Sequence, residues 1–324
     1  MMKARAEKTR RACAFAFGAL LVALAVLNSC GGISGRFGPP RPEGREGQTR
    51  PSSPSSPAKP ARIISLTPST TEILYGVGAF DRVVAVSDYC TYPPEVKNLP
   101  RVGGWNNPNM EQIASLRPDL VVFSDAQAQF VKDKVEAAGI RTLAVPSQTL
   151  EDAYTSIELV GRATGDEEAA AKLLEQTRAS VESIRVAAER LPKRRVLCVV
   201  DRVPGTLRDL YTAGEDSFIA QLIRIAGGEP VAPPGAERWG KIQKEAVVAL
   251  DPDVVLDLMM HKEQGGGFDE DTLSVWKELP TLRAVREARV YPVRDETVLH
   301  PSQLVADSAR KFAELIHPEA FAKK

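Results

Sequence analysis

The sequence predicts an α/β protein made of two similar lobes with mainly parallel central sheets, joined by one long helix. The first observation is that short runs rich in β-branched residues alternate with segments of helical periodicity from residue 62 onward, as in layered α/β folds. The second observation is a repeat. The phrase MEQIASLRPDLVV at 110–122 returns as KEAVVALDPDVVL at 244–256, which is 134 positions later and without a gap.

The first lobe is expected to span residues 62–164. Its strands are predicted by β-rich runs at RIISL (62–66), RVVAVSD (82–88), DLVVFSD (119–125) and RTLAVP (141–146). The segments between these runs have apolar residues spaced near 3.6 and stop at Gly or Pro. They predict helices within 69–79, 107–118 and 129–139.

The second lobe is expected at residues 193–324 because the same alternation returns there. Its strands are predicted at RRVLCVVDR (194–202), DVVLDLMM (253–260) and RVYPVRD (289–295). Its helices are predicted within 217–228, 242–252 and 304–317.

A connector helix is expected at residues 165–192. The 26 residues between Gly165 and Pro192 contain neither Gly nor Pro, which predicts a helix of about 39 Å at 1.5 Å per residue. The alternative is a long core helix within one domain. The repeat on both sides of the segment favours a connector between two lobes.

Residues 1–29 are typical of a secretory signal. Five Lys or Arg residues and one Glu within residues 3–11 precede an apolar run at 12–27, in the order that a signal peptide has. The run is shorter than the roughly 18 to 20 residues of a spanning helix, so a retained membrane helix is the weaker interpretation. LNSC at 27–30 looks like a bacterial lipoprotein signal, with Cys30 as the lipidated first residue. A plain secretory signal is the alternative.

Residues 30–61 are expected to form a disordered linker behind Cys30, because they are dense in Gly, Pro and Ser. Residues 62–324 then carry 32 basic and 39 acidic side chains, a net charge of −7, which argues against nucleic acid as a partner. Cys90 and Cys198 lie in different lobes, and both are interpreted as lone thiols.

A Trp and a Glu recur with the repeat. Trp105 and Trp239 each stand six residues before a glutamate, Glu111 and Glu245. Both Trp residues are predicted to lie in loops at the carboxyl ends of strands, where α/β sheets bind ligands. Two facing indoles would suit a large conjugated ligand. The alternative is that both pack in the core.

The repeated LxPDxV phrase, the opening RIISLTPSTTEILYGVGAFDRVVAVSDYCTYPPEV (62–96) and the single long helix resemble the substrate-binding proteins of bacterial importers for cobalamin, ferric siderophores and haem. The resemblance covers residues 62–322. It implies a ligand cleft between the lobes, an ABC permease dimer with a cytoplasmic ATPase as partner, and an extracytoplasmic, lipid-anchored monomer.

The resemblance also assigns roles to individual residues. It implies that Glu111 and Glu245 pair with arginines of the permease dimer; a stabilising charge at a helix N-terminus is the alternative. It implies that Tyr89 touches the ligand, whereas Tyr92 before two prolines is expected to pack.

Other residues also follow predicted strands, at the carboxyl ends of the sheets, and are candidates for ligand contact: Ser69, Asp125, His261, Asp295 and His300. For each, a solvated loop residue is the plainer interpretation, and for Ser69 a helix N-cap. HPSQ at 300–303 stands where the family commonly has a Pro-Gly-Pro-Arg phrase, which puts a cationic contact to an anionic siderophore in doubt.

No catalytic residues and no resident cofactor are predicted. Gly76 and Gly78 end a predicted helix instead of starting one, so they do not cradle a phosphate, and a secreted α/β enzyme is a remote alternative. The three His residues all lie in the second lobe, which disfavours a bare metal ion. A corrinoid such as cobalamin ranks first as ligand. A ferric siderophore or haem is the alternative, with Tyr89, His261 or His300 as axial donors to haem.

Overall fold

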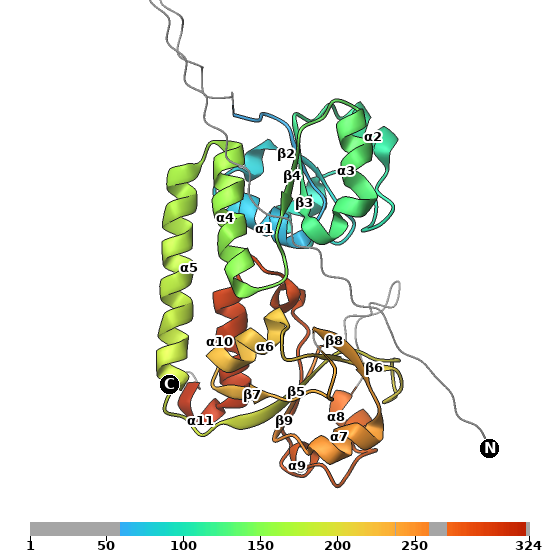
Figure 1. Ribbon diagram of the computed structural model, residues 1–324, viewed down its shortest axis with the longest axis vertical. Coiled ribbons are helices and arrows are strands. Elements are labelled where there is room, and N and C mark those ends of the chain that lie inside the picture. Colours follow the sequence, from blue (N-terminus) through green and yellow to red (C-terminus); the bar gives the residue numbers. More distant parts are fainter. Residues whose placement is uncertain (1–58, 237, 259–270, 322–324) are drawn as a thin grey trace, which may run out of the picture. The chain divides into compact units, whose positions relative to one another are not determined.

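The first lobe is built on a four-stranded parallel sheet with strand order β2-β1-β3-β4 (Figure 1). The strands are β1 (Ile63–Ser65), β2 (Val83–Val86), β3 (Leu120–Ser124) and β4 (Thr142–Val145). All four lie where the sequence predicts strands. The computed structural model describes residues 59–236, 238–258 and 271–321, all within one compact unit.

Helices cover both faces of this sheet. α2 (Met110–Ser115) and α3 (Ala128–Ala137) lie on one face, and α1 (Pro68–Gly76) lies on the other (Figure 1). Successive residues of a strand point to opposite faces, so Ile63 packs in the core beneath α1 and Ile64 in the core beneath α2 and α3. Short 3-10 helices at Phe80–Arg82, Pro94–Asn98 and Asp125–Gln127 complete the lobe.

The second lobe has a six-stranded mixed sheet, with order β10-β9-β5-β6-β8 and β7 paired to β5. β5 (Arg194–Asp201), β7 (Gly228–Pro230), β9 (Val254–Asp257) and β10 (Val290–Pro292) pair in parallel. β6 (Leu210–Ala213) is antiparallel to both β5 and β8 (Trp239–Ile242). β5, β9 and β10 lie where the sequence predicts strands, whereas β6, β7 and β8 were not predicted.

Two groups of helices cover the second sheet. α6 (Phe218–Ile225) and α10 (Val305–Ile316) pack in one core, and α7 (Lys244–Leu250) packs with α8 (Thr272–Trp276) and α9 (Arg283–Arg286) in the other. A 3-10 helix at Glu296–Leu299 and α11 (Pro318–Phe321) complete the lobe. α6, α7 and α10 lie within the predicted helical segments.

The predicted connector is α5 (Glu167–Ala188), and a second helix runs beside it. α4 (Leu150–Thr164) packs antiparallel to α5 (Figure 1), although the sequence analysis did not predict it. Ala153 and Tyr154 of α4 belong to the core of the second lobe, whereas Ile157 and Val160 belong to the core of the first. Both helices therefore tie the lobes together.

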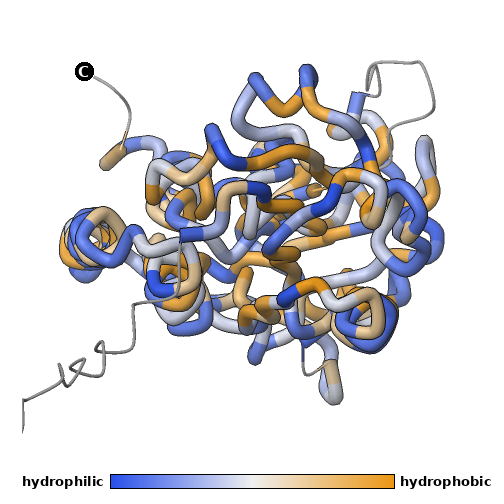
Figure 2. The backbone as a smooth tube through the Cα atoms, turned by 90° about the horizontal axis from the view of Figure 1, so that it is seen from above, coloured by the Kyte–Doolittle hydropathy of each residue, from blue (hydrophilic) through white to orange (hydrophobic). Residues whose placement is uncertain are grey.

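The outermost helix packs through one face only. In Figure 2 hydrophilic and hydrophobic residues alternate along the coil of α5, as they do in an amphipathic helix. Val181 and Ile184 of α5 are buried, whereas Val186 is 53% exposed. Within the described residues no helix is long and apolar enough to cross a membrane. Cys30 and the predicted signal lie outside those residues.

The aspartate of the repeated phrase has the same structural role in both lobes. The Asp119 carboxylate accepts a hydrogen bond from the backbone N–H of Arg62 (3.0 Å), and the Asp253 carboxylate accepts one from the N–H of Arg195 (2.8 Å). In return, the N–H groups of both aspartates donate to the carbonyls of the same arginines at 2.9 Å. Each aspartate therefore fixes the start of one strand, β1 or β5, to the start of its neighbour, β3 or β9.

The turn before each aspartate is also repeated. Arg117 after α2 and Asp251 after α7 both have left-handed backbones, with φ of 46° and 38°. Pro118 and Pro252 follow them and cannot continue a helix. Asp251 in addition accepts a hydrogen bond from the N–H of Arg283 at 2.8 Å. The duplication thus extends from sequence to backbone conformation.

Candidate ligand-binding site

A cavity of about 330 Å³ lies where all four strands of the first lobe end. Residues from the carboxyl ends of these parallel strands meet a short segment that precedes α10 of the second lobe. The described residues that line the cavity are Thr67, Pro68, Ser69, Tyr89, Trp105, Ser124, Ser147, Leu299, His300 and Pro301. This is the position at which α/β sheets bind ligands.

Tyr89 stands on a loop that an arginine holds in place. Nη1 of Arg101 donates to the carbonyls of Ser87 (2.8 Å) and Cys90 (2.6 Å), on either side of Tyr89. Cys90 is buried, and burial raises the pKa of its thiol. The Tyr89 ring itself remains 57% exposed. A fixed backbone that presents an exposed aromatic ring suits ligand contact.

Trp105 lies at the tip of a tight loop. Gly103 has φ of +96°, and a side chain there would meet the Asn107 carbonyl oxygen at 2.9 Å, so the turn requires glycine. The Trp105 carbonyl accepts a hydrogen bond from Nε2 of Gln127 at 2.7 Å. The indole is partly buried and lines the cavity.

Ser124 supplies a hydroxyl that has no partner. Its side chain is 2% exposed, and Oγ has no hydrogen bond to any described residue. An unpaired buried hydroxyl costs about 1–3 kcal/mol. Since Ser124 lines the cavity at the end of β3, a polar group of a ligand would offset this cost.

His300 faces the first lobe from the opposite wall. Its Nδ1 donates to Oε1 of Glu72 at 2.6 Å, and Oγ of Ser302 donates to Oε2 of Glu72 at 2.5 Å. Nε2 of Gln303 donates to the Glu72 carbonyl at 2.7 Å. Glu72 lies on α1 and is 1% exposed. The phrase HPSQ, which departs from the family pattern, thus binds a buried carboxylate that the sequence analysis did not single out.

Two other predicted residues have roles outside the cavity lining. Asp125 accepts a hydrogen bond from Oγ of Ser147 at 2.8 Å. Asp295 accepts from the N–H of Thr297 (3.1 Å) and from Nζ of Lys311 (3.2 Å). Partial burial alone would raise the pKa of Asp295, but the hydrogen bonds from Thr297 and Lys311 outweigh it, and the pKa is lowered.

Ser69 lines the cavity but does not cap α1. The N-cap is Thr67, one residue before the helix begins at Pro68, and its side chain makes no capping bond. Ser69 lies inside the first turn and is buried. His261 lies outside the described residues. Within them no cluster of three or more His, Cys, Asp or Glu side chains could hold a metal ion.

Trp239 differs from the prediction. It does not lie in a loop after a parallel strand, because it begins β8, which pairs antiparallel with β6. Its side chain is 50% exposed and is not part of the cavity lining. Nη1 of the preceding Arg238 donates to Oε1 of Gln148 at 2.7 Å, beside the cavity residue Ser147. Trp239 therefore lies close along the chain to a contact between the lobes.

Glu111 and Glu245 have equivalent positions. Each is exposed in the first turn of its helix, α2 or α7, and neither forms an ion pair with a described residue. The side chain of Asn109 already caps α2 by accepting from the N–H of Gln112 at 3.0 Å. Glu111 is therefore not the N-cap of α2, although its charge lies in the first turn, where it is favourable.

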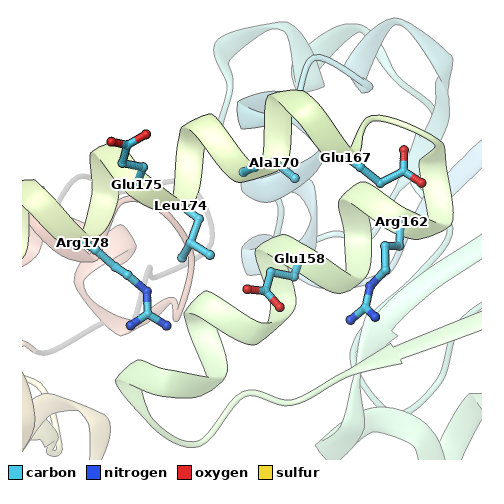
Figure 3. A pocket seen from close by; sticks show the side chains of 8 residues that line it. Glu158, Arg162, Glu167, Ala170, Leu174, Glu175 and Arg178 are labelled. Atoms are coloured by element: carbon cyan, nitrogen blue, oxygen red, sulfur yellow. The ribbon is translucent and has the colours of Figure 1, made fainter.

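A larger hollow of about 660 Å³ is the groove between α4 and α5 (Figure 3). Glu158 and Arg162 project from α4, and Glu175 and Arg178 from α5 (Figure 3). The groove is lined by side chains of both charges, and none of the described residues along it is aromatic or has an unpaired buried hydroxyl. The smaller cavity is the better ligand site because it has both.

Residues 63–297 match the family model described as periplasmic binding protein. The chain is 31% identical over 264 residues to an uncharacterized ABC transporter substrate-binding lipoprotein, YvrC of Bacillus subtilis, covering 80% of this chain and 81% of that protein.

Two further similarities concern proteins with named ligands. A vitamin B12-binding protein of Yersinia pestis is 29% identical over 196 residues, which cover 60% of this chain and 68% of that protein. The solved structure of the periplasmic haem-binding protein RhuT from Roseiflexus superposes with a TM-score of 0.69 at 26% identity. That superposition covers 80% of this chain and 98% of RhuT.

Proposed function

The chain belongs to the periplasmic binding protein family, and from that premise we propose that it captures a corrinoid such as cobalamin between its lobes and delivers it to an ABC permease. The similarity to YvrC supports the role of a substrate-binding component. The corrinoid is the finer part of the proposal, and the cavity is the observation that carries it.

The cavity combines aromatic surface with few polar groups. Trp105 and Tyr89 supply the aromatic faces, and Ser124 supplies a buried hydroxyl that lacks a partner. Small-molecule sites typically have this mixture. None of the described lining residues is Arg or Lys, so a highly anionic chelate would find little compensating charge there.

The volume of the cavity also bears on the ligand. At about 330 Å³ it is at the lower end of the roughly 300–1,000 Å³ usual for ligand pockets. A corrinoid would therefore place one part of its ring in the cavity and extend beyond it. Trp239, half exposed and next to the Arg238–Gln148 contact, is our candidate for contact with the extending part.

Haem is the second candidate. His300 on the cavity wall offers an imidazole nitrogen, which haem iron accepts as an axial ligand. A ferric siderophore is the third, and it lacks such an observation in its favour.

Delivery needs an anchor and a docking surface. We assign the anchor to a lipid on Cys30, which would hold the protein at the outer face of the membrane. We assign the docking surface to Glu111 and Glu245. The exposure of both carboxylates and their lack of ion pairs within the described residues support the docking role. A monomer with two such carboxylates matches a permease dimer, because each subunit would receive one.

Trp fluorescence of the chain without its lipid tests the proposed ligand. Cyanocobalamin, haemin and a ferric hydroxamate are titrated separately. Corrinoid binding should quench Trp105 emission, whereas the fully buried Trp276 provides a less accessible background. Saturable quenching by cyanocobalamin at micromolar concentration or below supports the proposal. Binding of haemin alone, or of none of the three, contradicts it.

A further inference from the structure

We propose that His300 coordinates the metal ion of the bound chelate through Nε2, and that Glu72 holds its ring in position. The inference rests on the proposed function, because it concerns the same cavity. It narrows the ligand to a metal complex with an exchangeable axial position, such as a haem or an aquo-corrinoid.

The hydrogen bond to Glu72 sets the tautomer of His300. A carboxylate only accepts hydrogen bonds, so Nδ1 at 2.6 Å from Oε1 carries the proton. In the neutral ring, the free lone pair then belongs to Nε2. A metal ion requires this lone pair.

Glu72 is itself fixed. Its second carboxylate oxygen accepts from Oγ of Ser302, and its backbone carbonyl accepts from Nε2 of Gln303. Burial of the side chain leaves it 1% exposed, so water does not compete for the carboxylate. The orientation of the imidazole is therefore set before any ligand arrives.

Nε2 is the ring nitrogen that remains for the cavity. His300 is part of the cavity lining, and Nε2 has no hydrogen-bond partner among the described residues. Metal-binding His residues usually donate their other ring N–H to a carboxylate or carbonyl, which orients the ring and makes it a better donor. The Glu72–His300 pair has this arrangement.

A purely structural latch between α1 and residues 300–303 explains less. Ser302 and Gln303 already join this segment to Glu72 through two hydrogen bonds. A latch also gives no reason for His300 to line the cavity. The two roles are separable, because only metal coordination changes the visible spectrum of a bound chelate.

Absorption spectroscopy of the complexes tests the inference. Haemin and aquocobinamide have exchangeable axial positions, whereas cyanocobalamin and ferrioxamine are coordinatively saturated. For the unaltered protein, we expect the visible bands of the first two to shift to those of an imidazole complex. The saturated pair should show no such shift.

The matched variant is His300→Asn. Its amide N–H₂ can replace Nδ1 as donor to Glu72, while no nitrogen lone pair reaches the metal. We expect an unchanged melting temperature, loss of the band shift and about 10- to 100-fold weaker binding of haemin or aquocobinamide. His300→Ala should regain the shift when millimolar imidazole is added. Glu72→Gln should keep the shift but bind about tenfold more weakly.

Several results would overturn the inference. One is a band shift that persists in His300→Asn, and another is its loss in His261→Ala or Tyr89→Phe instead. If cyanocobalamin binds but no chelate shows a shift in the unaltered protein, axial coordination is refuted while the proposed function stands. If none of the four chelates binds, the proposed function itself fails.

Discussion

The two lobes carry the same repeated phrase but contribute to the site unequally. Of the ten cavity-lining residues in the described part of the chain, the first lobe supplies seven, from the ends of a wholly parallel sheet. The described residues of the second lobe supply Leu299–Pro301, and its sheet ends in the antiparallel strands β6 and β8. Glu111 and Glu245, by contrast, occupy equivalent exposed positions on the two lobes.

This difference has a physical explanation. A two-fold symmetric partner presents the same surface twice, so it favours two equivalent docking positions. An asymmetric ligand imposes no such requirement, and the cavity walls are free to differ. The lobes therefore agree where we propose that a permease binds, and they differ at Trp105 and Trp239.

The largest expected effect is on ligand uptake, and it concerns the equivalent glutamates of the two lobes. Glu111→Ala and Glu245→Ala should each reduce uptake of the ligand by at least about tenfold, since each removes one proposed charge pair at the interface with the permease. Ligand affinity of the purified variants should not change. Uptake by cells with the cognate permease and fluorescence titration measure the two quantities. Reduced uptake in only one of the two variants would contradict the proposal that Glu111 and Glu245 have equivalent docking roles.

The next effect concerns the difference between the lobes. Trp105→Ala should weaken binding by about 2 kcal/mol, roughly 30-fold in Kd, because the indole lines the cavity. Trp239→Ala should cost under about 0.7 kcal/mol, roughly threefold. Calorimetric titration of both variants gives the comparison. Equal losses would show that the two indoles act as the matched pair that the sequence suggested.

Stability should distinguish the two aspartates of the repeat. Asp119→Ala should lower the free energy of unfolding by about 1 kcal/mol and Asp253→Ala by about 2 kcal/mol. Asp253 is the less exposed of the two and also forms an ion pair with Arg283. Urea denaturation measures both. A smaller loss for Asp253 than for Asp119 would contradict this ranking.

The second lobe and the start of the connector helix should respond differently to acid. Burial lowers the pKa of His317 in the second lobe, with a further contribution from Arg194. The stability from neutral His317 is present above its unfolded pKa, near 6.5, and is lost as pH falls through the lowered value. Burial alone would raise the pKa of Asp166, but hydrogen bonds from Lys59, Thr164 and Arg82 outweigh it and lower the pKa.

The contribution of Asp166 is therefore present above its unfolded pKa, near 3.9, and is lost only as pH falls below that. We expect His317→Gln to flatten the decline in melting temperature just below pH 6.5, and Asp166→Asn to affect only the region below about pH 4. Thermal melts across pH 3 to 8 measure this. An unchanged pH profile in His317→Gln would refute the assignment.

The smallest effect concerns the repeated left-handed residues. Arg117→Gly should stabilise the fold by about 0.5 kcal/mol, because glycine adopts positive φ without strain. Asp251→Gly should not stabilise it, since the change also removes the hydrogen bond from the N–H of Arg283. Melting temperatures of the two variants are compared, and a larger gain for Asp251→Gly would contradict this account.

The sequence predicted the elements with strong local signals. Buried strands such as β3 and β9 are continuous apolar runs, and α5 has no internal breaker. α4 was missed although Thr149 and Asp152 form a capping box at its start, which is a recognised start signal. β6 (LYTA), β7 (GEP) and β8 (WGKI) were missed because none of them is a continuous aliphatic run, in contrast to the equally short β9 (VVLD).

The site was harder to predict than the fold. Trp105 and Ser69 follow a predicted strand or enter a predicted helix, so local pattern selected them, whereas Tyr89 was selected through the family resemblance. The Glu72–His300 contact joins residues 228 positions apart, and no periodicity in a single sequence encodes it. Trp239 was placed in a loop because the helix that follows it matches the first copy, and WGKI at 239–242 lacks the apolar pattern of a strand.

The antiparallel pair α4 and α5 has a mechanical consequence. A lone helix between two bodies bends and twists easily, whereas two helices anchored in both cores act as a braced beam. Two helices packed in this way resist a wide separation of the lobes, so a bound ligand would dissociate slowly. Fast release would then require another protein to push the lobes apart. Contacts at two equivalent points, one on each lobe, would allow this.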